Sequence, residues 1–539
     1  MASIDEAVAP STSGAAFVRQ ASGLVRLGTP WRIMVMVVLL SGGIGVFMSE
    51  FYLEGPGTFP HMNLLLAVVV CCVPQLGFCA VYAFLAGAMP RSGGEYIYIS
   101  RVFGPFYGFV INVGAYVALC FYSAVTAFLT VTVALSPIAS TYGVITDSHS
   151  ALSLGTWFAS PDHAILVAAA FVVGSAILVC FGMRTYYRVQ AATWWVGMAC
   201  FVALLILMAV NSHGSFVHAL NTFGAKSGGG PNVFAAVTAA ARKAGVASGY
   251  TFGATVSMAA FLTLVSVTGY IGGEVRTPLR TQMIGMVGGA TICAVIFFVA
   301  PLLIAHLVGL GWNKDASVIA LSGKSPLSQS PVLTFYGLLL TSSPVVLLVI
   351  GFGLVILTVV MVPQNMIMCS RMIFAWSFDR LVPRQLANIN RRTGAPLTAV
   401  VVSAVIILVL VILYGKGKIG YFNPILLVGV VWAAVGVTGV MFPFRKRAKR
   451  QWEDAPAAVR TRIGPLPLIT VLGAISVVWY ALAIYLALSI DALGANKTSN
   501  LVFCGITFLA PMAYFGCVYA YRRREGFNMA ATFAELPPD

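Results

Sequence analysis

Apolar segments long enough to cross a lipid bilayer recur from residue 31 to residue 521. The hydrocarbon core is about 30 Å thick, so a spanning helix needs about 20 apolar residues. Lipid offers no partner to backbone N–H and C=O groups, so these segments are expected to form helices, whose hydrogen bonds are internal. Twelve spans are predicted, at about 31–54, 62–88, 103–138, 164–182, 190–211, 251–275, 281–311, 344–378, 396–414, 421–443, 465–490 and 499–521. The eighth is predicted as one tilted or kinked helix, although Pro363 lies inside it.

The composition is that of an integral membrane protein. Of the 539 residues, 59% are hydrophobic and only 9% are charged, whereas soluble domains carry about 25% charged residues. Length alone would suggest several soluble domains, but the apolar segments run throughout and indicate one integral domain. No cleavable signal pattern precedes the first span, so residues 1–30 are expected to form a cytoplasmic tail.

The distribution of lysine and arginine predicts the orientation. With the N-terminus inside, the cytoplasmic parts carry 24 of the 32 basic residues and the outer parts carry 8. Basic residues concentrate in cytoplasmic loops, so both termini are predicted to be cytoplasmic, including the tail at 522–539. The basic loop at 446–464 is expected to face anionic lipids of the cell membrane, and the net charge of +16 is not taken as a sign of nucleic-acid binding. The oligomeric state is not predicted.

The chain offers no set of residues for catalysis or metal binding. Its ten cysteines all fall in apolar segments, and none has metal-ligand spacing with histidine. No cluster of acids, bases or metal ligands appears in the spans, and no glycine-rich phosphate loop with lysine is present. A non-enzyme without a cofactor is therefore expected.

Two predicted spans are interrupted by glycines. The first contains the stretch SGGIGVF at 41–47, and the sixth contains Gly269, Gly272 and Gly273 ahead of GEVRTP at 273–278. Backbone groups left unpaired in hydrocarbon cost several kcal/mol each, so a broken helix at membrane depth should line a cavity. Broken helices in corresponding positions of two halves are typical of the binding site of a secondary transporter.

Three stretches resemble the amino acid–polyamine–organocation superfamily of transporters. MPRSGGEY at 89–96 is similar to the family's signature between spans two and three. GEVRTP at 273–278 is similar to its acidic, basic and proline ending of span six, and the residues from SRMIFA at 370–375 to RTGAP at 392–396 are similar to its link between spans eight and nine. The resemblance covers most of residues 31–445.

The resemblance implies an all-α integral membrane fold. Its core would be a leucine-transporter-type 5+5 inverted repeat with broken helices 1 and 6, in which ten helices fill residues 31–445. The repeats would cover about 31–211 and 251–445, and helices 11 and 12 would follow at 465–521.

The resemblance also implies where a substrate would bind. In the family, span one carries two glycines around a small polar residue; here Ile44 stands between Gly43 and Gly45, which puts one side-chain hydrogen bond to substrate in doubt. Counting back from Glu274 places the break of span six near residues 263–266. The predicted substrate-binding residues are Gly42, Gly43, Ile44, Gly45, Val46, Phe47, Tyr116, Phe261, Thr263, Leu264, Val265, Ser266 and Asn365.

The broken helices suit a zwitterion. The N–H groups of Val46 and Phe47 would begin a half-helix without partners, and such a helix start suits a carboxylate. The carbonyl groups left free near residues 41–42 and 263–264 suit an ammonium group. An α-amino acid has both ends, and the mostly apolar residues of span six favour a neutral or apolar one.

Polar residues elsewhere complete the candidate site, and Asn112 and Gln364 are candidates for coupling or gating. Asn112 and Tyr116 lie four residues apart and share one helix face, and Gln364 and Asn365 lie at mid-depth in span eight, where polar side chains usually face the protein interior.

Three acidic residues lie near the predicted site. For Glu50, three interpretations stay open: a coupling proton carrier, attraction of a cation, or a position among the outer headgroups. Glu274 is expected to pair with an arginine in a gate, and Glu95 is expected on a cytoplasmic connecting helix.

Several alternatives stay open. The function predicted first is a secondary amino acid permease, symporter or antiporter, that works by alternating access. A polyamine or cationic amino acid carrier is the second interpretation and a non-transporting nutrient sensor the third. Span five has no lysine or arginine for the proton coupling known in some family members, and Thr358 is the one hydroxyl between Val345 and Cys369, so the coupling ion, H⁺ or Na⁺, is left open. Residues 234–243 are predicted as a short outer helix, either a lid or an inert loop element.

Overall fold

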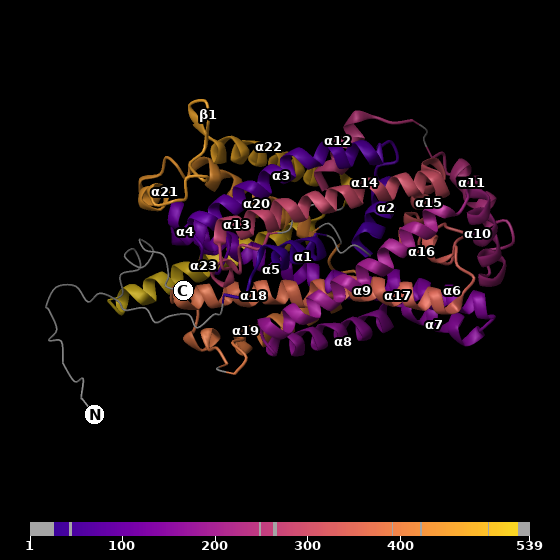
Figure 1. Ribbon diagram of the computed structural model, residues 1–539, viewed down its shortest axis with the longest axis horizontal. Coiled ribbons are helices and arrows are strands. Elements are labelled where there is room, and N and C mark those ends of the chain that lie inside the picture. The colour runs from indigo at the N-terminus through magenta and orange to yellow at the C-terminus, as the bar shows by residue number, and fades with distance from the viewer. Residues whose placement is uncertain are drawn as a thin grey trace.

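The computed structural model describes residues 26–41, 46–246, 249–261, 267–390, 392–420, 423–493 and 495–526, and of residues 46–51, 423–425 and 492 it describes the backbone alone. Helices dominate, and most of them run along the longest axis of the molecule (Figure 1).

The first half of the chain contains eleven α-helices among its described residues. They are α1 (Pro30–Leu40), α2 (Val46–Thr58), α3 (Leu64–Ala88), α4 (Glu95–Val102), α5 (Pro105–Leu129), α6 (Ser136–Thr146), α7 (His149–Ala159), α8 (Pro161–Cys180), α9 (Met183–Val210), α10 (His213–Ser227) and α11 (Val233–Lys243). A π-helical segment, Thr130–Leu135, joins α5 to α6 without ending the helix, so the third span is longer than predicted and reaches Thr146.

The second half contains the remaining helices and two short strands. The helices are α12 (Phe252–Phe261), α13 (Pro278–Met283), α14 (Gly289–Leu307), α15 (Leu310–Leu321), α16 (Leu333–Leu338), α17 (Pro344–Val359), α18 (Met361–Phe378), α19 (Leu397–Gly415), α20 (Asn423–Met441), α21 (Lys449–Glu453), α22 (Leu468–Ser489) and α23 (Thr498–Arg524). The strands are β1 (Arg462–Ile463) and β2 (Leu466–Pro467), which pair antiparallel. Shorter helical turns are Gly272–Glu274, Ile284–Gly288, Arg384–Ala387, Lys446–Ala448 and Asp491–Leu493.

Within the described residues, nine helices are long and apolar enough to cross a membrane, and a tenth is added if the pair Leu426–Met441 and Lys446–Glu453, bent by 78°, is one span. The chain is thus an integral, multi-pass membrane protein. The eighth predicted span is one such helix, Pro344–Phe378. The first and sixth predicted spans consist of shorter helices, and the inverted repeat and a total of twelve spans stay predictions.

Both spans that were predicted to be broken are divided into separate elements. Helix α1 ends at Leu40, Ser41 has a non-helical ψ of 59°, and α2 begins at Val46. Helix α12 ends at Phe261, and Val267 and Thr268 belong to no helix. The residues between, 42–45 and 262–266, lie outside the described residues.

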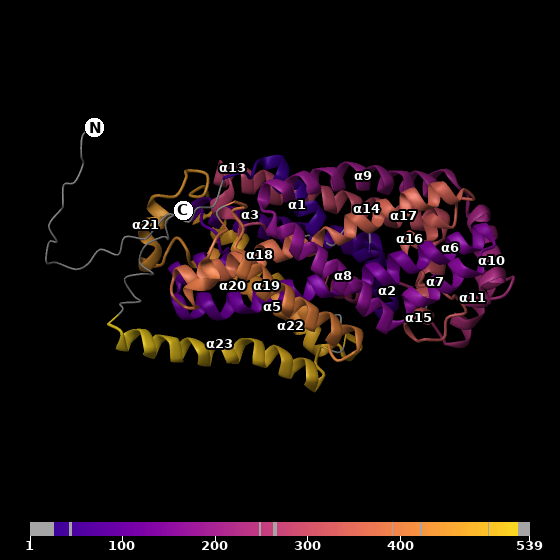
Figure 2. The same ribbon diagram turned by 90° about the horizontal axis from the view of Figure 1, so that it is seen from below.

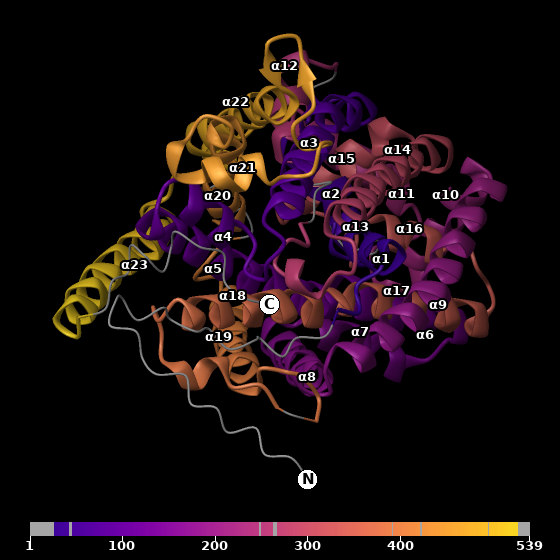
Figure 3. The ribbon, with the colours of Figure 1, turned by 60° about the vertical axis from the view of Figure 1, so that its left-hand side comes forward.

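Helix α5 lies at the centre of the bundle. It packs against α4, α8, α18, α19, α20 and α23, and its span is the most buried of the nine. Helix α23 runs along one side of the bundle and is the least buried span (Figures 2 and 3). The buried core therefore forms where α5 and α18 meet.

The long bundle has two ends that differ in structure (Figure 1). One end, called here the α4 end, carries α4, α13 and α21. The opposite end, called here the α11 end, carries α7, α10, α11 and α15. Helix α23 finishes at the α4 end, where the Arg522 guanidinium donates to the carbonyl of Arg380 at 3.2 Å.

Two connections contain more structure than the sequence indicates. The 446–464 segment, predicted as a loop, forms two short helices and the first strand of a hairpin. The long 212–250 connection forms two helices, α10 and α11, rather than one. The start of α10 has a helix-capping signal that hydropathy does not register: the Ser212 hydroxyl accepts from the N–H of Ser215.

Candidate functional site

Much of the predicted substrate site falls outside the described residues. Gly42, Gly43, Ile44, Gly45, Thr263, Leu264, Val265 and Ser266 lie there entirely. Val46, Phe47 and Glu50 lie in the first turns of α2, where the backbone alone is described.

The contact between α5 and α18 fixes the orientation of span eight. The Thr126 hydroxyl of α5 donates to the Met361 sulfur at 3.4 Å, and Cys369 lies 3.6 Å from the Cys120 sulfur. Residues four apart share a helix face. Asn365 lies midway between Met361 and Cys369, so it belongs to the face of α18 that packs on α5.

The side-chain amide of Asn365 is buried and unpaired. The residue is 1% exposed, and neither its oxygen nor its nitrogen has a hydrogen-bond partner among the residues that the structure describes. Its neighbour Gln364 is fully buried too, and the Tyr186 phenol lies beside it. Leaving a buried polar group unpaired costs about 1–3 kcal/mol.

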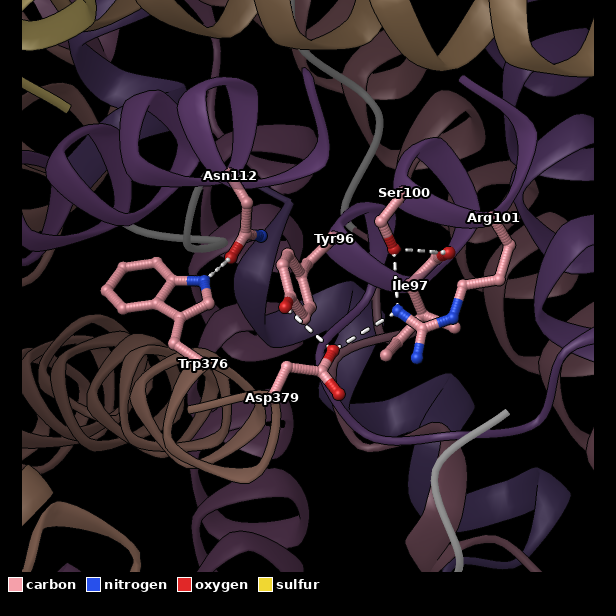
Figure 4. A network of polar contacts seen from close by, with 7 residues as sticks. All are labelled: Tyr96, Ile97, Ser100, Arg101, Asn112, Trp376 and Asp379. Carbon is pink, nitrogen blue, oxygen red and sulfur yellow. Dashed lines mark hydrogen bonds and ion pairs between the residues drawn. The ribbon is translucent and has the colours of Figure 1, made fainter. Parts of the chain in front are cut away.

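Asn112 and Tyr116, the two residues of α5 in the predicted site, form hydrogen bonds with other side chains. The hydroxyl of Tyr116 is 3.1 Å from the Ser403 hydroxyl of α19. The Asn112 amide donates to Glu95 at 2.7 Å. It also accepts from the Trp376 indole at 2.7 Å, and Figure 4 shows this second bond. Asn112 therefore joins α4 to α18 at the α4 end, while Tyr116 joins α5 to α19.

A second polar cluster joins α4 to the end of α18. The Arg101 guanidinium lies 3.3 Å from the Asp379 carboxylate, with both side chains fully buried. The Tyr96 hydroxyl donates to the same carboxylate oxygen at 2.7 Å, as Figure 4 shows. Ser100 accepts from Arg101 at 2.7 Å. A buried ion pair with these added hydrogen bonds fixes the position of α4 against α18.

Glu274 has the arginine partner that the sequence predicted. The Arg371 guanidinium donates to both Glu274 oxygens, at 2.8 and 3.3 Å, and both side chains are at most 3% exposed. This fork-to-fork geometry is the strongest form of such a pair. It ties the segment that follows α12 to α18; its role as a gate stays a prediction.

The same segment also pairs its backbone with two distant stretches. The N–H of Gly93 donates to Tyr270 O at 3.0 Å, and Ser92 forms an antiparallel bridge with Ile271. On the other side, Gly28 donates to Glu274 O at 2.9 Å and bridges Val275. Three chain segments thus lie side by side at the α4 end: the one before α1, the one before α4 and the one after α12.

Glycine is required at one position in this closure. Gly94 has φ of 60°, in the region that favours glycine. A Cβ atom there would lie 2.7 Å from the Tyr82 hydroxyl and would meet the Tyr270 ring. The second glycine of the SGG motif therefore allows the backbone to approach two tyrosines.

The α11 end is held by a separate cluster. The Tyr52 hydroxyl of α2 donates to Phe297 O at 2.9 Å. Asn313 of α15 donates to Tyr52 O at 3.2 Å and accepts from the Tyr336 hydroxyl at 2.8 Å. These bonds attach α2 to α14 and α15, and α15 to α16. Helix α2 packs on α15 and α16, whereas α1 packs on α9, α14 and α18.

Aromatic rings cover the α11 side of the interrupted helices. Phe261, the last residue of α12, stacks with Phe59 at 6.2 Å. Trp312 stacks on Phe234 of α11 at 4.8 Å and donates through its indole to the Phe234 carbonyl. The predicted short helix at 234–243 is thus α11, and it packs on α15.

A comparison with known families decides the identity. The family model described as "Amino acid permease" matches residues 29–517, which include both interrupted spans, the α4-end clusters and α18. The chain belongs to the amino acid permease family. This places the protein in the amino acid–polyamine–organocation superfamily. Amino acid permeases are membrane transporters, a class distinct from enzymes. A search of curated proteins finds no match.

Several residues that organise this permease were missed from the sequence. Arg101 and Asp379 connect α4 with the end of α18, and Trp376 connects α18 with α5 through Asn112. In the sequence, each of the three resembles an ordinary residue at a helix end. One signal was present: charged residues placed among apolar segments rarely stay unpaired. Which residues pair depends on contacts between helices more than 250 positions apart, and no spacing along the chain contains that information.

Proposed function

We propose that this permease carries a neutral α-amino acid across the cell membrane by alternating access. The carboxylate would be held by the N–H groups at the start of α2, at Val46 and Phe47. The ammonium group would be held by carbonyls near residues 41–42 and 263–264. Charge at a helix start is worth up to about 2 kcal/mol in partly buried sites, and the backbone contacts need no side chain from Ile44.

The observation that carries the proposal is the unpaired amide of Asn365. It lies on the face of α18 that packs on α5, and α18 also packs on α1, the first half of the interrupted span. Burying a polar group without a partner destabilises the protein, and a ligand-binding role would explain why such a group is present. The amide offers both a donor and an acceptor, and therefore suits a substrate with both.

A neutral substrate is favoured because the two carboxylates that contact α18 or directly follow it are already paired with arginines. Glu274 is paired with Arg371, and Asp379 is paired with Arg101. Neither carboxylate is left to balance a cationic side chain. A polyamine or a cationic amino acid would call for such a balance.

Alternating access is supported by the different neighbours of the two halves of each interrupted span. Helix α2 is bonded to α14 and α15 at the α11 end. The segment after α12 is bonded to residues 28 and 91–93 and to α18 at the α4 end. Opening one end requires one set of these bonds to break, and the other set can remain.

Uptake into proteoliposomes tests the proposal. A radiolabelled neutral amino acid should accumulate, and unlabelled neutral amino acids should compete better than cationic ones or polyamines. Competition by polyamines with none by any amino acid would overturn the proposed substrate class. Coupling to H⁺ or Na⁺ would be read from uptake with and without each ion gradient.

The role of Asn365 has a sharper test. Asn365→Leu removes an unpaired buried amide, so the purified protein should gain thermal stability, by up to about 1–3 kcal/mol. Substrate affinity should fall at least about tenfold, which corresponds to the loss of one hydrogen bond of about 1.4 kcal/mol. Unchanged affinity in a stabilised variant would show a structural role only.

The matched control is Thr438→Val. Thr438 is also fully buried in a span, but its hydroxyl is already bonded to Ala434 of its own helix. Affinity should stay the same in this variant. For the glycines, Gly43→Leu and Gly45→Leu should abolish binding in a folded, monodisperse protein; binding that survives both would remove the role given to the α2 start.

A further inference from the structure

Glu95, the first residue of α4, is a fully buried carboxylic acid. The Tyr82 hydroxyl of α3 donates to one carboxyl oxygen at 2.6 Å, and the Asn112 amide of α5 donates to the other at 2.7 Å. The Tyr270 phenol, from the segment after α12, faces the same group. Glu95 thus stands where three separate parts of the α4 end meet.

No basic residue in the described part of the chain forms an ion pair with Glu95. The nearby arginines have other acidic partners: Arg101 pairs with Asp379, and Arg371 pairs with Glu274. A buried carboxylate without a cation is unusual, because an isolated charge in a low-dielectric interior is costly. Among the described residues, the groups that donate to this acid are all neutral.

The other elements packed on α4 add few charges. Helix α20 packs on α4 and has no titratable residue. The turn Lys446–Ala448 brings Arg447 near Gly104 at the far end of α4 and next to Arg101. On α4 itself, Tyr98 has a buried hydroxyl. The titratable groups facing Glu95 are accordingly tyrosines: Tyr82, Tyr98 and Tyr270.

Burial raises the pKa of the Glu95 carboxyl, although the bonds from Tyr82, the backbone, Asn112 and Tyr270 act in the opposite direction. The largest cause is the loss of water around the carboxyl. Entry of water at the α4 end would remove that cause and return the pKa toward the ordinary value of about 4.3. The protonation state of Glu95 and the closure of this end are therefore linked.

The partners of Glu95 belong to parts that would separate on opening. Tyr270 lies in the segment that bonds through its backbone to residues 91–93, whereas Asn112 and Tyr82 lie within the long spans α5 and α3. Movement of residues 267–277, the described segment between α12 and α13, would carry Tyr270 away and expose the Glu95 carboxyl. No other described carboxylate at the α4 end combines full burial with the absence of an arginine partner.

We propose that Glu95 is a proton-binding site that links the pH on the α4 side of the membrane to the opening of that end. This inference rests on the proposed alternating access. Protonated Glu95 stabilises the closed α4 end, and ionised Glu95 stabilises the open, water-filled one.

The sign of the effect follows from linkage. The closed state binds the proton more tightly than the open state. Acid on the α4 side therefore favours closure, and rising pH favours opening. The effect falls in the window between the ordinary pKa of a glutamate and the raised pKa of the closed state. Each unit of difference between the two pKa values changes the closed-to-open ratio by up to about tenfold across that window.

Exchange of labelled for unlabelled substrate in proteoliposomes, with equal pH on both sides, measures turnover without a driving proton gradient. In the native protein the exchange rate should rise with pH. In Glu95→Gln, which cannot ionise, the rate should be low and should not change with pH. Glu453→Gln, at an exposed carboxylate paired with Lys449, should keep the native profile.

Tyr82→Phe provides a signed second test. It removes a donor that favours the ionised carboxylate, so the midpoint of the pH profile should move to higher pH. Tyr480→Phe is the matched control, because Tyr480 is a buried tyrosine of α22 whose hydroxyl has no partner in the described part of the chain. A native pH profile in Glu95→Gln, or an unmoved midpoint in Tyr82→Phe, would overturn the proposal.

A measurement without substrate separates this inference from the proposed function. Ser92→Cys places a thiol in the closed α4 end, and its labelling by a maleimide reports opening. The ratio of labelling rates with and without Glu95→Gln cancels the pH dependence of the thiol itself. The ratio should change with pH even if no amino acid is transported; a constant ratio would refute the role of Glu95 whatever the substrate proves to be.

Discussion

At the scale of single residues, buried charges organise the α4 end. Arg371 with Glu274, and Arg101 with Asp379, are ion pairs with at most 3% exposure. The exposed pairs, such as Lys449 with Glu453 at 3.7 Å, contribute little because water screens them. A buried pair adds little net stability, but the loss of one partner leaves the other charge uncompensated.

Glu274→Gln should therefore destabilise the protein by about 3–5 kcal/mol. The measurement is thermal unfolding in detergent, with Glu453→Gln as the exposed counterpart, in which no change is expected. The double variant Glu274→Gln with Arg371→Met should recover part of the loss, because it removes both charges. Equal losses in the single and double variants would contradict the argument.

Gly94→Ala should also destabilise the protein. The residue has φ of 60°, and a Cβ atom would lie 2.7 Å from the Tyr82 hydroxyl. Left-handed backbone costs about 1–2 kcal/mol for an L-residue, and the displaced tyrosines add to this. Gly174→Ala is the control, because a Cβ atom on α8 would have no neighbour within 4 Å; the melting temperature should fall only in Gly94→Ala.

At the scale of elements, the parts of the interrupted spans contact neighbours at opposite ends of the bundle. The segment after α12 is held by backbone pairing with residues that precede α1 and α4. Backbone pairing tolerates many side chains but depends on register. If this end opens during transport, these bridges have to separate.

A disulfide between Ser92→Cys and Ile271→Cys tests that separation. The two residues form an antiparallel bridge, so their Cα atoms lie about 4.5–5.5 Å apart, within the range of a disulfide. In a Cys517→Ser background, oxidation should stop transport, and reduction should restore it. Each single-cysteine variant should transport under both conditions; full transport by the oxidised double variant would show that this end does not open there.

At the scale of the whole molecule, the distribution of basic residues predicts which side each end faces. The α4 end carries the basic turn and helix at 446–453 and the arginines that end α23. Cytoplasmic loops of membrane proteins are rich in lysine and arginine, so this end is expected to face the cytoplasm.

Labelling of intact cells with an impermeant maleimide checks this orientation. In the Cys517→Ser background, Lys418→Cys beyond the end of α19 should be labelled from outside. Arg460→Cys, in the segment before β1, should be labelled only after the membrane is permeabilised. Both positions are exposed, so accessibility to the reagent depends on the side of the membrane alone, and the reverse pattern would invert the predicted topology.

The spans and the family were predictable because both depend on local sequence. Hydropathy over about 20 residues indicates a helix in lipid, and the SGG and GEVRTP motifs are contiguous. The interruption of the first and sixth spans, to which α1 and α12 belong, was predictable for the same reason. Glycine and the apolar residues around it are neighbours in the chain. The helices α10 and α21 were missed, because short amphipathic elements outside the membrane carry no such long apolar signal.

By itself, the sequence determined that this protein crosses a membrane many times and that its first and sixth spans are divided, because lipid forces each span to satisfy its own backbone. Only the tertiary structure decided that Glu274 pairs with Arg371, that Asn365 is buried without a partner among the described residues, and that neutral donors from three segments surround Glu95. Those outcomes depend on which faces of helices hundreds of residues apart pack together. The apolar pattern of each span is compatible with many different packing arrangements.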